Sequence, residues 1–212
     1  MTVSWVVVAL AALAQDVKAE PVAEGAPAGV AEAVRKELLP SGVRVVRDGK
    51  PLFDFWLGKA IPARPPQESL QLRYTMLKPG TLVGAVKVHA EGHDFKNQKY
   101  PPGLYTLRYA EQPEDGDHQG TSETKDFLCL SQAAADTKPE AISQEDLIKI
   151  SSKVVARKHP AVLYLVRSET AEKVPAIVRD EANVRWILEC EAGTAAGKLR
   201  LGIVVVGKAA DQ

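Results

Sequence analysis

The stretch that decides the fold is Leu82-Val-Gly-Ala-Val-Lys-Val-His-Ala90, in which the side chains alternate in character. In an extended chain Val86 and Val88 fall on one face, whereas Lys87 and His89 fall on the other. An alternation with a period of two residues is typical of a β-strand that buries one face. We therefore predict a strand here.

The same alternation appears on both sides of this stretch. After the turn signal Pro101-Pro102-Gly103, residues 104–110 alternate again, with Thr106 and Arg108 on their polar face. Upstream, Asp48-Gly49 separates two apolar runs and predicts a hairpin turn, because both residues tolerate a positive φ. The runs expected to form further strands are 43–47, 51–57, 70–77, 126–130, 161–167, 173–178, 184–190 and 198–206.

Two segments carry a helical pattern instead. Residues 29–39 place apolar side chains at helical spacing, and Pro40 would end that helix. Ser143-Gln-Glu-Asp146 resembles a capping box and predicts a second helix that ends near Lys153. Many short strands without regular strand–helix alternation predict a mainly β protein: an antiparallel β-sandwich of jelly-roll type with two short helices.

The N-terminal segment predicts export. Residues 3–14 form an apolar run of about 12 residues, which matches the core of a secretory signal peptide and is too short to span a bilayer. We predict a signal peptide over residues 1–19, cleaved after Ala14 or Ala19, and no membrane span once it is removed. Residues 20–41 would then be a linker with a short amphipathic helix, and residues 42–208 a single β-sandwich domain.

Composition limits the classes of partner. The 212 residues carry 27 Lys and Arg against 27 Asp and Glu, so the formal net charge is zero. A neutral chain gives no support for nucleic acid as a partner, because such binding needs a basic surface. The charges are nevertheless segregated, since residues 111–146 hold ten acidic and two basic side chains. This acidic span indicates a solvated loop region, a cation site or a contact with a basic partner.

Four motifs resemble an uncharacterised family of exported bacterial β-sandwich proteins. They are Leu77-Lys-Pro-Gly-Thr-Leu-Val-Gly84, Tyr100-Pro-Pro-Gly-Leu-Tyr-Thr-Leu-Arg-Tyr109, Gln112-Pro-Glu-Asp-Gly-Asp-His118 and Lys125-Asp-Phe-Leu-Cys-Leu130. The similarity extends from about residue 42 to residue 207. It implies export and a β-sandwich, but the family has no assigned activity and therefore supplies no catalytic residues.

The acidic span contains the strongest metal-site candidate. Asp115, Asp117 and His118 place three ligand types within four residues, around a glycine that allows tight curvature. Carboxylate oxygens suit a hard cation, and the imidazole would favour a transition metal. The spacing lacks the full calcium-loop signature, so a surface turn remains the alternative. No other cofactor is predicted.

Three further residues are candidate ligand contacts. Trp56 shares its strand face with polar residues and could offer a half-exposed ring to a sugar, Arg108 lies on the polar face of its strand, and His159 precedes an apolar strand. The sequence contains no nucleophile motif and no phosphate-binding glycine loop. An enzyme is therefore the less favoured class.

The two cysteines leave two alternatives open. Cys129 and Cys190 both follow the apolar parity of their strands, so both side chains are expected to be buried. In an oxidising compartment they could form a disulfide, and otherwise they would be separate buried thiols.

Together these features predict an exported, non-catalytic binding or interaction module of the cell envelope, periplasmic or extracellular. Its expected partner is an envelope protein or a polysaccharide. The alternatives are a metal-binding protein that uses residues 114–118, a carbohydrate-binding module, or an enzyme.

Overall fold

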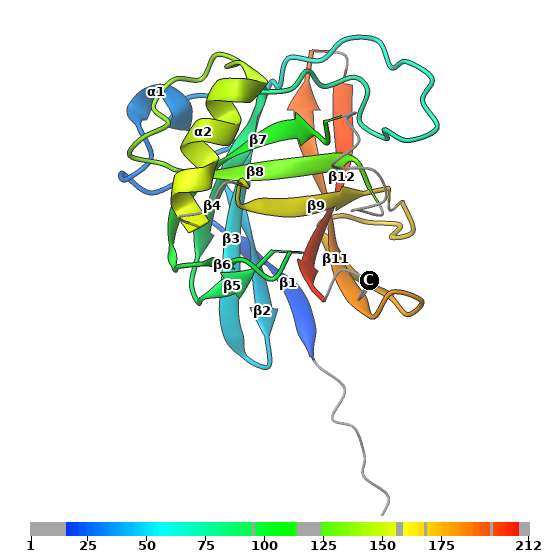
Figure 1. The fold of residues 1–212 in the computed structure, drawn as a ribbon. Coiled ribbons are helices and arrows are strands. Elements are labelled where there is room, and N and C mark those ends of the chain that lie inside the picture. The colour runs from blue at the N-terminus through cyan, green and yellow to red at the C-terminus, as the bar shows by residue number, and fades with distance from the viewer. Residues whose placement is uncertain are drawn as a thin grey trace, which may run out of the picture.

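The computed structural model describes residues 16–94, 96–113, 124–155, 159–167, 169–195 and 197–207. These residues form twelve strands and two helices (Figure 1). The first seven strands are β1 (Val17–Val22), β2 (Gly42–Arg47), β3 (Lys50–Leu57), β4 (Leu82–Val88), β5 (Gly92–His93), β6 (Lys99–Tyr100) and β7 (Gly103–Glu111). The other elements are β8 (Asp126–Gln132), β9 (Val162–Val166), β10 (Ala176–Asp180), β11 (Arg185–Thr194), β12 (Gly197–Val206), α1 (Glu32–Arg35) and α2 (Gln144–Val155).

Ten of the described strands form one antiparallel sheet in the order β1-β2-β3-β4-β7-β8-β9-β12-β11-β10, and β5 pairs with β6 separately. The first and last strands of this order, β1 and β10, also contact each other, so the sheet curls into a nearly closed barrel (Figure 1). The prediction of a mainly β, antiparallel fold with two helices is confirmed.

Strand β9 makes the sheet continuous. Val162, Leu163 and Tyr164 pair with β8, whereas Leu165 and Val166 pair with β12. One short strand therefore joins the two halves of the sheet at a corner. The jelly-roll sandwich is not confirmed, because ten of the twelve described strands form one continuous sheet rather than two packed sheets.

The strands that decided the prediction are present. Asp48 and Gly49 both have positive φ, 50° and 75°, in the turn between β2 and β3, as the hairpin signal requires. In β4, Val86 and Val88 are buried and Lys87 is exposed. The strand is therefore present, but buried and exposed residues alternate only at 86–88, because residues 82–86 are all buried.

Residues 70–77 do not form the predicted strand. The carboxylate of Asp126 accepts hydrogen bonds from the backbone N–H groups of Arg73 (2.8 Å) and Tyr74 (3.2 Å). The Tyr74 hydroxyl donates to the carbonyl of Val166 at 2.9 Å and accepts from the N–H of Gly202 at 3.0 Å. The backbone of this segment is therefore held by the buried carboxylate of Asp126 and by the hydroxyl of Tyr74. In a strand, the hydrogen bonds would instead go to the backbone of a neighbouring strand.

Helix α2 begins as predicted. Ser143 Oγ accepts a hydrogen bond from the backbone N–H of Asp146 (3.0 Å) and donates to its carboxylate (2.7 Å). The helix ends at Val155, two residues beyond the expected end, and buries Leu147, Ser151 and Val154. Helix α1 covers only Glu32–Arg35 of the predicted 29–39.

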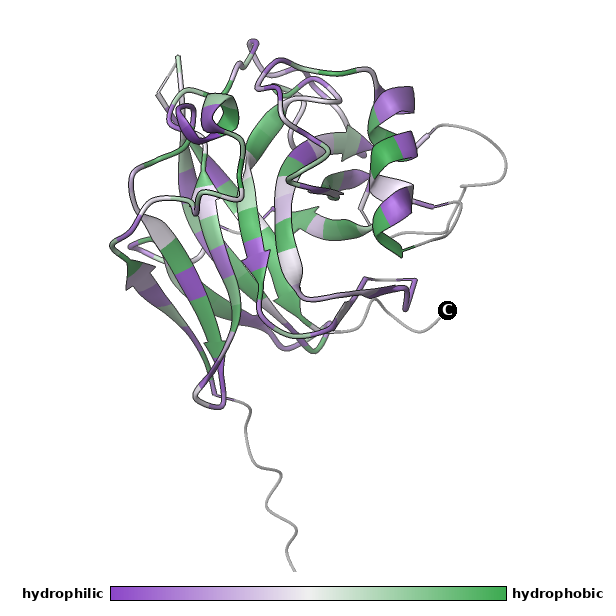
Figure 2. Cartoon of the chain, turned by 90° about the vertical axis from the view of Figure 1, so that its left-hand side faces the viewer, coloured by the Kyte–Doolittle hydropathy of each residue, from purple (hydrophilic) through white to green (hydrophobic). Residues whose placement is uncertain are grey.

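Three apolar clusters form the core. The largest fills the barrel, and its fully buried members include Phe55, Leu107, Leu130, Leu188 and Leu201. A second lies between the outer face of β3 and β4 and the segment around α1. A third lies between α2 and the outer face of β7, β8 and β9 (Figure 2). Among the described residues, no helix is long and apolar enough to cross a membrane.

Candidate ligand site at the open end of the barrel

Trp56 is not the half-exposed platform that the sequence suggested. Its side chain is only 3 % exposed, within the cluster beneath α1. Its indole N–H donates to the carbonyl of Glu24 at 2.9 Å. The segment that precedes β2 covers this face of β3, so the half-exposed ring that the sequence suggested is not observed, and a ligand contact at Trp56 stays a prediction.

Arg108 is fully buried and has a structural role. Its guanidinium donates to both carboxylate oxygens of Asp136 (2.7 and 2.8 Å) and to the carbonyls of Gly80 (2.7 Å), Glu140 (2.8 Å) and Lys138 (2.5 Å). A guanidinium has five N–H donors, and these contacts use all of them. All five donors are therefore engaged within the protein, and a ligand contact at Arg108 stays a prediction.

Cys129 and Cys190 are both free and buried. Cys190 belongs to the cluster inside the barrel, whereas Cys129 belongs to the cluster outside it, beneath α2. The wall of the barrel separates the two thiols, so the disulfide alternative is not the observed state. Burial raises the pKa of each thiol to about 12.

The predicted metal ligands Asp115, Asp117 and His118 lie outside the described residues. Within the described part of the chain, no group of three His, Cys, Asp or Glu side chains is placed to hold a metal ion. His159 lines a cavity beneath α2, and its role as a ligand contact stays a prediction.

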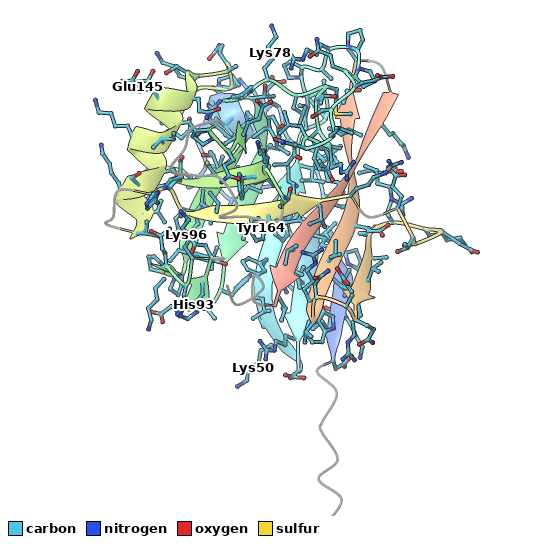
Figure 3. The ribbon with its side chains drawn as sticks, turned by 45° about the vertical axis from the view of Figure 1, so that its right-hand side comes forward. Lys50, Lys78, His93, Lys96, Glu145 and Tyr164 are labelled. Carbon is cyan, nitrogen blue, oxygen red and sulfur yellow. The ribbon has the colours of Figure 1, made fainter. Side chains whose placement is uncertain are left out.

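A large cavity among the described residues lies at one end of the barrel and has a volume of about 810 Å³. The residues that line it come from four places: the β2–β3 hairpin, the β5–β6 hairpin, the loop before β11 and the end of β12. In Figure 3, His93 and Lys50 lie toward this end, and Lys78 lies toward the opposite end. We call this cavity the barrel mouth.

The floor of the barrel mouth is apolar and the rim is polar. The floor is formed by Phe53, Tyr100, Trp186 and Val205, all buried members of the barrel core. The polar or charged residues that line the rim are Arg47, Glu91, His93, Asn97 and Asn183. An apolar cavity edged by a few polar groups is the usual form of a small-molecule site.

The β5–β6 hairpin is fixed in position on one side of the mouth. Asp94 Oδ1 accepts hydrogen bonds from the backbone N–H groups of Lys96 (3.0 Å) and Gln98 (2.9 Å), which shapes the turn. Gly92 lets the Tyr100 ring lie flat across the hairpin, because a Cβ there would come within 2.3 Å of that ring. The aromatic floor is therefore preformed on this side.

On the opposite side, Trp186 lies at the start of β11 with the guanidinium carbon of Arg179 5.3 Å from its ring centroid. This distance allows a cation–π contact, which keeps a positive charge beside the aromatic floor. The Arg179 side chain also pairs with Glu181 at 3.1 Å. Glu91 on the rim pairs with Lys99 at 2.8 Å, so its negative charge is balanced.

Val184 on the rim combines two unusual properties. It is 63 % exposed, although it is a large apolar residue, and its φ is 49°. A β-branched residue in this left-handed region is strained, and strain of this kind is concentrated at functional sites.

No protein-family model, curated protein or solved structure matches the chain.

The arrangement can hold a molecule that has an apolar body and a polar head. The body would rest on the aromatic floor, and the head would meet the rim and the cation of Arg179. Sequence reasoning missed this site. The parity of β11 placed Trp186 in the core, but nothing in the pattern showed that four distant segments meet at one end of the barrel.

Proposed function

We propose that the protein is an exported, non-catalytic binding module of the bacterial cell envelope, and that its ligand is an amphiphile held in the barrel mouth. The observation that carries the proposal is this 810 Å³ cavity with its apolar floor and polar rim. The apolar N-terminal run of residues 3–14 supports the assignment to the periplasm or the extracellular space.

The size and charge of the barrel mouth define the ligand class. Its volume falls within the range of about 300–1,000 Å³ that is typical of ligand pockets. Arg47 on the rim pairs with Asp48 at 3.7 Å, and Arg179 over Trp186 pairs with Glu181 at 3.1 Å, so the charges near the opening are balanced. A polar head group is therefore favoured, with a flat aromatic or branched aliphatic body that matches the floor.

Val184→Asn separates binding from stability. Asparagine tolerates the left-handed region, so the variant should raise the free energy of unfolding by about 1 kcal/mol. The same change removes an exposed apolar side chain from the rim, so it should weaken binding of 1-anilinonaphthalene-8-sulfonate about threefold or more. Fluorescence titration measures the affinity, and urea denaturation measures the stability.

The matched control is Leu70→Asn, which also exchanges an exposed apolar residue for asparagine. Leu70 is 96 % exposed and does not line the barrel mouth. The control should bind the probe like the unmodified protein. Equal affinity of the unmodified protein and Val184→Asn, or an equal loss in both variants, would contradict binding at the mouth.

A further inference from the structure

A second cavity lies outside the barrel, between α2 and the outer face of β7, β8 and β9. Its volume is about 280 Å³. The apolar residues that line it are Ala110, Pro113, Phe127, Cys129, Ile148, Pro160 and Val162. Its polar and charged lining residues are Lys96, Gln98, Glu111, Gln112, Gln144 and His159. We call it the α2 cavity, and it shares no lining residue with the barrel mouth.

Hydrogen bonds fix the walls of the α2 cavity. Gln144 at the start of α2 donates from Nε2 to the carbonyl of Glu111 at the end of β7 (3.0 Å). Across the cavity, Gln98 donates from Nε2 to Asp94 Oδ2 (2.7 Å) and to the carbonyl of Pro160 (3.3 Å). The cavity is therefore a fixed space between anchored elements, and a ligand would need to order little of the chain.

The position of α2 against the sheet is also fixed. Ser151, one turn beyond Ile148, is fully buried and donates from Oγ to the carbonyls of Leu130 (2.6 Å) and Ala161 (3.1 Å). These bonds hold the helix against the sheet at this position. On the floor, Phe127 stacks on Tyr164 with ring centroids 5.4 Å apart, which holds an aromatic face in a fixed orientation.

We propose that the α2 cavity binds a small, neutral, apolar molecule of one or two fused rings. An apolar cavity of about 150 Å³ holds one benzene, so 280 Å³ suits a molecule up to about twice that size. The ligand is neutral because the floor is apolar, and a charge placed there would lose its hydration. This site is independent of the function proposed for the barrel mouth.

The two cysteines provide a matched pair of reporters. Cys129 is 1 % exposed and lines the α2 cavity, whereas Cys190 is 2 % exposed and lies inside the barrel. Burial raises the pKa of both thiols, so both react slowly in the folded protein. A ligand that slows the reaction of Cys129 and not that of Cys190 therefore reports access to Cys129.

The experiment labels the native protein with methyl methanethiolsulfonate, a small neutral reagent. The thiolate attacks the reagent sulfur, a methyl disulfide forms and methanesulfinate leaves. Peptide mass spectrometry over time should show that Cys129 reacts at least about tenfold faster than Cys190. Saturating indole, used as the probe ligand, should slow the labelling of Cys129 at least about fivefold and leave Cys190 unchanged.

Two variants of α2 test the position of the ligand. Ile148→Trp should fill the α2 cavity, so it should slow the labelling of Cys129 and abolish the effect of indole. Lys149→Trp, on the exposed face one residue away, should behave like the unmodified protein. Equal labelling rates of the two cysteines, or fast labelling of Cys129 that indole does not slow, would overturn the proposal.

Discussion

Arg108 and Asp136 form an ion pair inside the protein, with side chains 0 % and 4 % exposed. Such a pair persists only if its remaining donors and acceptors are satisfied, because removing two charges from water is costly. Thr106 Oγ1 donates to Asp136 at 2.6 Å, and three carbonyls accept from Arg108. The pair therefore ties the segment after β8 and the turn at Gly80 to β7.

Arg108→Lys should lower the free energy of unfolding by about 3 kcal/mol, since an ammonium group cannot replace a fork of five donors. The matched variant is Arg44→Lys. Arg44 also makes a two-point contact with a carboxylate, that of Asp54 (2.6 and 2.9 Å), but its side chain is 39 % exposed. Its loss should stay below about 1 kcal/mol. Equal losses in urea denaturation would refute the structural role of Arg108.

Asp54 on the outer face of β3 gives the stability a dependence on pH. Burial alone would raise the pKa of this carboxyl, but hydrogen bonds from Arg44 and from His89 (2.9 Å to His89 Nε2), together with their charges, hold the pKa below its usual value. A pKa lowered by folding contributes stability above the unfolded pKa. That contribution is lost as the pH falls through the folded pKa.

Asp54→Asn should therefore destabilise the protein more at pH 7 than at about pH 3, which lies below the pKa of an aspartate in the unfolded chain, where the stabilisation from the lowered pKa begins to be lost. Urea denaturation of both proteins at the two pH values measures the difference. A destabilisation that is the same at both values would contradict the lowered pKa.

At the scale of elements, β1 bears on where a signal peptide can be cut. All six residues of β1 pair with β2, from Val17 opposite Arg47 to Val22 opposite Gly42. Asp16 extends this pairing, because its carbonyl accepts from the N–H of Asp48 at 2.8 Å. Cleavage after Ala19 would remove half of the strand, whereas cleavage after Ala14 would leave it whole.

We therefore expect the exported protein to begin at Gln15, which intact-mass and N-terminal peptide measurements on secreted material would show. The physical reason is that loss of residues 15–19 would remove three rungs of the β1–β2 ladder and expose the edge of β2. A start at Glu20 would contradict this expectation, and a retained Met1 would contradict export.

Elements with a local signal could be predicted, and those fixed by distant partners could not. The Asp48-Gly49 turn and the Ser143 cap are set by neighbouring residues, so the sequence indicated both. The local pattern of residues 70–77 predicted a strand. The residue that fixes their actual conformation, Asp126, is remote in sequence and could not be recognised from that pattern. Parity correctly predicted that both cysteines are buried, but it could not show that Cys129 faces α2 rather than the barrel interior.

At the scale of the whole molecule, the barrel mouth could be predicted only if the order of the strands in the sheet were known. Phe53, Tyr100 and Trp186 come from three segments that meet only when the sheet curls. The period of a strand shows which side chains share a face, but not which strand lies next to it. The antiparallel β class was therefore predictable, whereas the curvature through β9 and the site that it creates were not.

The contact between β1 and β10 gives the barrel a seam. Nine backbone ladders join the ten described strands, but only non-ladder contacts join β1 to β10. Separating β1 from β10 breaks no backbone ladder, so it costs less free energy than separating any of the nine paired neighbours. Arg179 lies on β10, and Arg47 lies on β2, which pairs with β1. The two arginines therefore lie on either side of the contact between β1 and β10. Among the described strands, this contact is therefore the one place where the barrel wall can open without breaking a backbone ladder.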